Sequence, residues 1–175
     1  LFEELGATLR LQAANIKVKQ VNFKLDWQPT TLCRAELDWL RLSQIVNNLV
    51  SNSIKFTQQG FVKVSVSNTS NTLSLVIEDS GCGMTPEQQQ KLFQPFVQAD
   101  ASINRKYGGS GLGMSIVQHL VELMGGQISV TSQLNLGTKV LVSLPAKFSV
   151  LDLGLVSEAY AQDEAIKSWL TLWGI

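Results

Sequence analysis

The stretch Asp79-Ser-Gly-Cys-Gly-Met84 constrains this chain more than any other. Its acidic residue ends a run typical of a β-strand, Leu73-Ser-Leu-Val-Ile-Glu78, and two glycines follow closely. A carboxylate is thereby expected at a strand end, beside backbone that turns sharply. It would suit a ligand with an exocyclic amine, and the missing Cβ atoms of Gly81 and Gly83 would let a flat ring approach. The same pattern is also an ordinary strand-to-turn sequence, so other parts of the chain must decide between the two readings.

The strongest helical pattern in the sequence runs from Trp39 to Phe56, with Asp38 as its expected N-cap. Helical spacing predicts one apolar stripe along it, made of Leu42, Ile45, Val46, Leu49 and Phe56.

A polar arc adjoins that stripe and consists of Asn48, Asn52 and Lys55, at spacings of four and three. The arc could be the solvated margin of an amphipathic helix. Asparagine, however, is a poor helix former, so two asparagines one turn apart indicate that their amide oxygens have a functional role. Such oxygens are reasonable ligands for Mg²⁺, which takes further ligands from water and substrate phosphates.

Strand patterns flank this helix on both sides. Gly60 is expected to end the helix, and two hairpins are expected after it. The predicted strands are Val21 to Trp27, Thr31 to Arg34, Phe61 to Asn68, Thr72 to Glu78, Gln127 to Ser132 and Thr138 to Leu144.

The region after the Asp79 stretch first forms a short helix, capped by Thr85 with a proline at its first position. A short aromatic cluster follows at Leu92 to Phe96, and Phe93 and Phe96 are expected to anchor the segment after it. From Val97 to Gly109 no apolar face remains, which indicates a functional or mobile segment such as an active-site lid.

Four glycines in six residues, Gly108 to Gly113, then lead into a helix predicted from Leu112 to Met124. Glycines at the entry of a helix expose backbone N–H groups at the positive end of the helix dipole, which favours an anion. A low-complexity loop is the competing interpretation, but the position after the basic residues Arg105 and Lys106 favours phosphate.

Composition excludes several classes of partner. The formal net charge is zero, so the sequence does not indicate electrostatic binding to nucleic acid over a broad surface. No apolar run is long enough to span a membrane and no signal peptide is evident, so the sequence is expected to be a cytoplasmic piece of a larger protein. The two cysteines, Cys33 and Cys82, are expected to be free thiols.

Taken together, four motifs closely resemble the N, G1, F and G2 boxes of the catalytic and ATP-binding domain of sensor histidine kinases. They are Asn48-x-x-x-Asn52-x-x-Lys55, Asp79-x-Gly-x-Gly83, Phe93-x-x-Phe96 and Gly109-Ser-Gly-Leu-Gly113. The resemblance implies the Bergerat fold of the GHKL group: an α+β two-layer sandwich with a mixed β-sheet packed on one side by helices, and a mobile ATP lid. The spelling of the lid, Gln98-Ala-Asp-x-Ser followed by Arg-Lys-Tyr-Gly-Gly, is most similar to the hybrid subclass.

The same resemblance implies ATP and Mg²⁺ as cofactors. It assigns Asp79 to the adenine amine, Asn52 to the metal, Asn48 and Lys55 to the phosphates and to catalysis, and Phe56 to the adenine face. The other residues it assigns to the nucleotide are Gly81, Gly83, Met84, Phe93, Arg105, Lys106, Gly109, Ser110, Gly111, Leu112 and Gly113.

The expected domain organisation is a catalytic and ATP-binding domain at 1–147, of which 1–20 is a residual linker, and a tail at 148–175. An apolar helical face in the tail could pack on this domain or on a neighbour, or could be the first helix of a receiver domain. The implied partners are a phosphoacceptor domain and a response regulator or receiver domain. A homodimeric parent protein is expected, and attachment of that parent to the inner membrane is left open.

The single histidine, His119, matches none of the family's phosphoacceptor pattern and is expected to be structural. Two other functions stay open: a GHKL-type ATPase clamp, or a nucleotide-sensing module without catalysis. The clamp would need a glutamate one turn before the metal asparagine to activate water, and that position holds Asn48.

Overall fold

The computed structural model describes residues 5, 9, 20–28, 33–95 and 111–150. The expected lid at 97–109, most of the expected linker at 1–20 and the tail helix lie outside these residues. No helix within the described ranges is long and apolar enough to cross a membrane.

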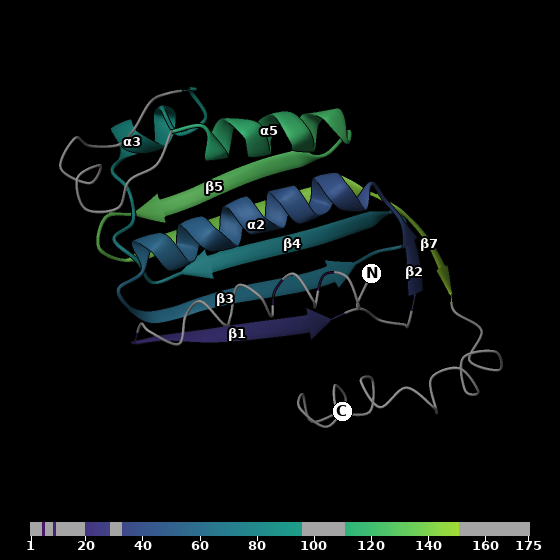
Figure 1. Cartoon of the computed structure of the whole chain (residues 1–175), viewed down its shortest axis with the longest axis horizontal. Coiled ribbons are helices and arrows are strands. Elements are labelled where there is room, and N and C mark those ends of the chain that lie inside the picture. Colours follow the sequence, from purple (N-terminus) through teal and green to yellow (C-terminus); the bar gives the residue numbers. More distant parts are fainter. Residues whose placement is uncertain (1–4, 6–8, 10–19, 29–32, 96–110, 151–175) are drawn as a thin grey trace.

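The described part forms two layers (Figure 1), a mixed five-stranded sheet and a layer of helices on one of its faces. The sheet has the order β1-β3-β4-β6-β5. Its strands are β1 (Gln20–Gln28), β3 (Gln59–Asn68), β4 (Thr72–Asp79), β6 (Gly137–Pro145) and β5 (Gln127–Gln133). The helices are α2 (Trp39–Phe56), α3 (Pro86–Gln90) and α5 (Gly113–Leu123). This architecture confirms the predicted α+β sandwich with helices on one side.

Strand β1 pairs with β3 in parallel, whereas the other ladders of the five-stranded sheet are antiparallel. A separate two-stranded sheet joins β2 (Cys33–Glu36) to β7 (Lys147–Val150). Strand β2 therefore lies two residues later than the predicted Thr31 to Arg34. Strand β7 includes residues on both sides of the expected domain boundary after residue 147.

The core lies between the sheet and the two long helices. In β4 burial alternates along the strand, so Leu73, Leu75 and Ile77 face the helices. Asp79 continues that alternation and therefore lies on the buried face at the end of the strand. Leu5 and Leu9 are buried in the same core.

Helix α2 begins and ends at the predicted residues. The side chain of Asp38 accepts a hydrogen bond from the backbone N–H of Arg41, as expected of an N-cap. The predicted stripe is buried except for Phe56, which is half-exposed because it occupies the last helical position. Thr57 is the C-cap, and Gly60 lies within β3 with a φ of 112°, so the prediction that Gly60 ends the helix is wrong.

Candidate functional site

Three segments that are distant in the sequence meet at one end of the sheet (Figure 1). They are the end of β4 with the loop that follows it, the C-terminal half of α2, and the beginning of α5. Direct contacts tie them together, since the N–H of Cys82 donates to the carbonyl of Phe56 at 3.3 Å. The structure thereby brings the first and second predicted motifs, and the described residues 111–113 of the fourth, to a common place.

Asp79 is the buried acid of this site, with 7% of its surface exposed. Its Oδ1 accepts a hydrogen bond from the backbone N–H of Gly81 at 3.0 Å. Two further donors are the hydroxyl of Ser53 and the backbone N–H of Thr138. Burial raises the pKa of Asp79, and these three hydrogen bonds offset part of that rise because they stabilise the carboxylate.

The glycines around Asp79 are required by close backbone contacts. A Cβ on Gly81 would lie 2.7 Å from the carbonyl oxygen of Phe56. Gly83 has a φ of 62°, and a Cβ there would overlap the carbonyl of Gln133. Gly137 has a φ of 118°, and a Cβ there would overlap the carbonyl of Asp79. The loop after β4 is therefore held tightly against both α2 and the β5–β6 turn.

The polar arc of α2 faces the start of α5. A Cβ built on Gly113 would lie 3.2 Å from Oδ1 of Asn48 and 3.7 Å from Nδ2 of Asn52. The side-chain amide of Asn48 donates to the carbonyl of Gln44 at 2.9 Å, which turns its oxygen toward α5. The structure thus brings Asn48, Asn52 and Gly113 together.

Lys55 and Phe56 lie at the end of the same helix and are both half-exposed. The ammonium nitrogen of Lys55 lies 5.0 Å from the centroid of the Phe56 ring, within the range of a cation–π contact. A cation and an aromatic ring therefore lie side by side at this end of α2.

Helix α5 begins without a capping side chain, because its N-cap residue is Leu112. Gly111, just before it, has a φ of 72°. The backbone N–H groups of the first turn, at the positive end of an 11-residue helix, are therefore oriented as in an anion site.

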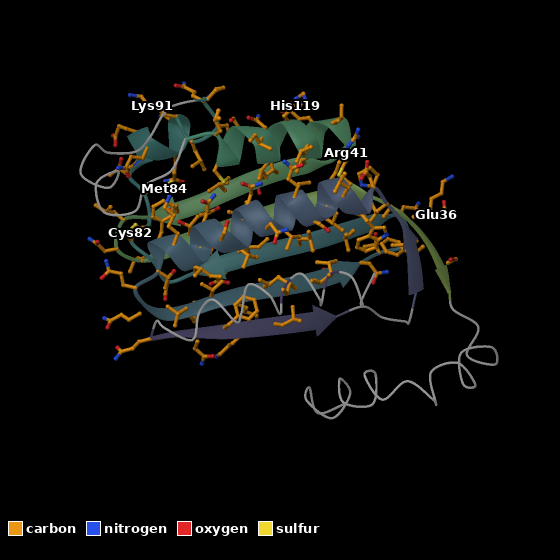
Figure 2. All side chains as sticks on the ribbon, in the orientation of Figure 1. Glu36, Arg41, Cys82, Met84, Lys91 and His119 are labelled. Atoms are coloured by element: carbon orange, nitrogen blue, oxygen red, sulfur yellow. The ribbon has the colours of Figure 1, made fainter. Side chains whose placement is uncertain are left out.

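Met84 and Phe93 are half-buried. Figure 2 shows Met84 and Cys82 at the end of the molecule where α2 finishes, whereas Glu36 and Arg41 lie at the opposite end. Between Met84 and Phe93, α3 begins with the predicted Thr85 cap, which forms a full capping box with Gln88.

The side-chain amide of Gln89 ties α3 to the edge strand β5. It donates to the carbonyl of Ser132 at 2.9 Å and accepts from the N–H of Ser132 at 3.1 Å. This pair of hydrogen bonds fixes the segment between the second and third motifs against the sheet.

Four predicted site residues, Arg105, Lys106, Gly109 and Ser110, lie outside the described residues. His119 is exposed on α5, and Figure 2 shows it on the side of that helix turned away from α2. Cys82 is a free, exposed thiol, as predicted. In the described ranges no group of three or more His, Cys, Asp or Glu side chains could hold a metal ion.

Sequence reasoning missed three residues that contact Asp79, namely Ser53, Thr138 and Gly137. A signal for Ser53 was present, because a hydroxyl stands where the helical pattern of α2 continues the buried stripe. Thr138 and Gly137 could not be found from periodicity, since their contact with Asp79 depends on the pairing of β4 with β6.

Comparison with known proteins places the described fold in a family. A model described as histidine kinase-, DNA gyrase B-, and HSP90-like ATPase matches residues 37–147. The autoinducer 2 sensor kinase/phosphatase LuxQ of Vibrio vulnificus is 40% identical over 152 residues, which cover 83% of this chain and 18% of LuxQ. The signal transduction histidine-protein kinase BarA of Escherichia coli is 50% identical over 106 residues, 58% of this chain and 12% of BarA. The chain thus spans a small part of the length of these relatives.

Two solved structures have a similar fold. The mycobacterial sensor histidine kinase MprB is 26% identical with a TM-score of 0.69, and the match covers 83% of this chain and 95% of that one. Full-length ShkA in complex with AMPPNP is 27% identical with a TM-score of 0.67, over 84% of this chain and 31% of that one.

Proposed function

Because this chain belongs to the family of histidine kinase-, DNA gyrase B-, and HSP90-like ATPases, we propose that it binds Mg²⁺-ATP and donates the γ-phosphoryl group to a histidine on a separate phosphoacceptor domain. Nucleotide binding is the common property of the family, and the relatives named above are sensor kinases. The transfer to histidine is the activity of the parent protein in two-component signalling.

The observation that carries the proposal is the buried carboxylate of Asp79 at the end of β4. It is oriented by donors from the loop, from α2 and from β6. The donor on α2 is Ser53, which directly follows Asn52 of the polar arc. Such a carboxylate can accept a hydrogen bond from the adenine amine. Gly81 lets the loop after β4 lie directly against the end of α2, beside this carboxylate. Phe56 and Met84 supply the apolar contact with the ring.

The phosphates would lie between α2 and the start of α5. Asn48 and Asn52 face Gly113 there, and the first turn of α5 offers backbone N–H groups at the positive end of its dipole. The ammonium group of Lys55 contacts the ring of Phe56 in this structure. Its flexible four-carbon side chain could instead turn toward an anion. The resemblance adds Arg105, Lys106, Gly109 and Ser110 to this side of the nucleotide.

The residues of this site fit Mg²⁺ only as a partner of the nucleotide. The amide oxygen of Asn48 is turned toward α5, and the amide of Asn52 lies one turn further along the same face. Neutral amide oxygens suit Mg²⁺, but the described residues offer no cluster of carboxylates at this place. We therefore assign Asn52 as the protein ligand, with phosphate and water oxygens completing the shell. When bound, the ion would neutralise charge on the phosphates.

Transfer, rather than hydrolysis, follows from the side chains on the phosphate side. Asn48 cannot act as a general base toward water, because an amide does not take up a proton near neutral pH. Phosphoryl transfer depends mostly on positioning and charge stabilisation, which the chain supplies, and on an in-line nucleophile, which the phosphoacceptor domain supplies.

The arrangement of the parent protein is proposed on the resemblance. Residues 1–147 would form the catalytic domain and 148–175 a tail leading toward a receiver domain. The partners would be the phosphoacceptor domain of a homodimeric parent and a downstream response regulator, with this domain in the cytoplasm.

Calorimetric titration with the ATP analogue AMPPNP tests nucleotide binding directly. We expect saturable binding that strengthens with Mg²⁺ and weakens when the base is guanine, because guanine presents a carbonyl where adenine has its amine. Equal affinity for adenine and guanine nucleotides, or no binding at all, would contradict the assignment.

A further inference from the structure

Ser53 is a polar residue in a buried position of α2. It is 5% exposed and lies among the buried side chains of the helix, between Val50 and Ile54. A hydroxyl buried without a partner is costly, so its hydrogen bond determines whether the position is tolerated. That hydrogen bond goes to the carboxylate of Asp79 on β4.

The donors to Asp79 differ in how they are supplied. Gly81 and Thr138 donate backbone N–H groups, so these two hydrogen bonds do not involve a side chain of the donor residue. Among the described residues, Ser53 supplies the side-chain donor, and it does so from a different layer of the fold. The orientation of the carboxylate is thereby linked to α2, the helix that also carries Asn48 and Asn52.

The number of donors also leaves room for a ligand. An ionised carboxylate has roughly four acceptor sites, and the three donors found among the described residues leave about one for a further N–H group. A single amine N–H of adenine matches that remaining site.

We propose that Ser53 is a positioning residue for adenine recognition: its hydroxyl, fixed on α2, holds the carboxylate of Asp79 so that its remaining acceptor site faces the nucleotide. The inference rests on the proposed function, since it concerns the residue that binds adenine.

Ser53 also favours the ionised form of Asp79. Burial raises the pKa of this carboxyl, and the hydrogen bonds from Gly81, Ser53 and Thr138 lower it again in part. Among the described residues, the titratable groups that interact with it are Glu78 and Cys82. Glu78, on the same strand, raises the pKa of Asp79 further. The pKa of the Cys82 thiol is itself raised, mainly by burial and also by the charge of Asp79. Removing the hydroxyl of Ser53 therefore moves the pKa of Asp79 upward.

The test compares ADP binding by the wild-type chain and by Ser53→Ala, in calorimetric titrations. Alanine fits the site and is the better helix former, so the variant is expected to fold. We expect ADP affinity to fall by roughly 3- to 10-fold, the effect of one ordinary hydrogen bond. Ser43→Ala is the matched control, because it is the same substitution on α2 about 15 Å nearer the helix start.

A double-mutant cycle separates positioning from a general structural effect. In an Asp79→Asn background, Ser53→Ala should leave ADP affinity nearly unchanged, because the carboxylate it positions is gone. If Ser53→Ala lowers ADP affinity by the same factor in both backgrounds, the inference is contradicted.

The pH profile gives a second readout. ADP affinity should fall as the pH is lowered through the pKa of Asp79, and in Ser53→Ala that fall should begin at a higher pH. Superimposable profiles would contradict the inference. If wild type binds ADP and Ser53→Ala binds it equally well, only the inference fails, whereas a wild type that does not bind ADP contradicts the proposed function itself.

Discussion

At the scale of single residues, Asp79 shows how a binding group opposes stability. Its pKa in the folded protein is raised by burial, above its value in the unfolded chain. Folding therefore favours the protonated form, and the contribution of this group to stability is full at low pH and is lost as the pH rises through the folded pKa. Near neutral pH the ionised carboxylate is retained at a cost to the fold, which is consistent with a role in binding.

Asp79→Asn should separate binding from stability. It removes a charge-assisted hydrogen bond to the adenine amine, worth about 1.5 to 3 kcal/mol or roughly 10- to 100-fold in ATP affinity. The melting temperature near neutral pH should be unchanged or higher, because a buried charge is gone. Calorimetry and thermal unfolding measure the two effects.

Glu78→Gln is the control. It also removes one negative charge, from the residue that precedes Asp79 in β4 and lies on the opposite face of the sheet. It should bind ATP like the wild type. Wild-type affinity in Asp79→Asn would remove Asp79 from the adenine site.

Asn52→Ala should cause a defect specific to the metal. The adenine contacts lie at the end of β4, so binding measured with excess chelator should change little. The gain in ATP affinity that Mg²⁺ gives should mostly disappear, because a protein ligand of the ion is lost. Titrations with and without Mg²⁺ measure this gain, and an unchanged gain would exclude Asn52 as a ligand.

Single residues were predictable where the interaction is local. The Asp38 cap and the Thr85 capping box depend on neighbours three residues away, and both are present. The role of Ser53 depends on a contact between α2 and β4, and no local pattern specifies which strand lies beneath that helix.

At the scale of elements, the side chain of Gln89 connects α3 to the sheet. Gln89 forms two hydrogen bonds with the backbone of Ser132, on the outer edge of β5. Gln89→Ala should lower the free energy of unfolding by about 1 to 2 kcal/mol, because both hydrogen bonds are lost. Chemical denaturation measures it, with the exposed neighbour Gln90→Ala as the control, expected within about 0.5 kcal/mol of wild type. Equal effects of the two variants would show that the contact does not stabilise the fold.

The start of α5 offers a prediction in which stability and binding move apart. Gly113→Ala places a Cβ 3.2 Å from Oδ1 of Asn48 and near Asn52. Nucleotide affinity should fall several-fold because the amide of Asn48 must shift to make room. Stability should hold or rise, since alanine is favoured over glycine in helices by up to about 1 kcal/mol. Titration with AMPPNP and thermal unfolding test both parts. An unchanged affinity would argue against a phosphate site between α2 and α5.

The elements themselves followed from periodicity, but their neighbours did not. The bounds of α2 and both hairpins match the predicted ranges closely, because each is encoded by local spacing and turns. The parallel pairing of β1 with β3 and the antiparallel pairing of β2 with β7 join segments far apart in the chain. Strand β2 was predicted two residues early, since a four-residue strand whose partner begins at Lys147 has little local signal.

At the scale of the whole molecule, the proposed site is assembled from motifs that the sequence separates by tens of residues. The order β3-β4-β6 brings Thr138 opposite Asp79, and the helix layer brings Gly113 beside Asn48. The resemblance of the motifs identified the family. That Ser53, Thr138 and Gly137 surround Asp79 could be seen only in the three-dimensional structure.

The most direct test of the central claim is phosphoryl transfer from ATP labelled on its γ-phosphate. The chain alone should release phosphate very slowly and should not label itself, because Asn48 does not activate water and His119 lacks the pattern of an acceptor. When the phosphoacceptor domain of the parent protein is added in trans, that domain should become labelled with an acid-labile, base-stable phosphate, and Asp79→Asn should slow the labelling. Label on His119 of the isolated chain, or brisk phosphate release without any acceptor, would contradict the account.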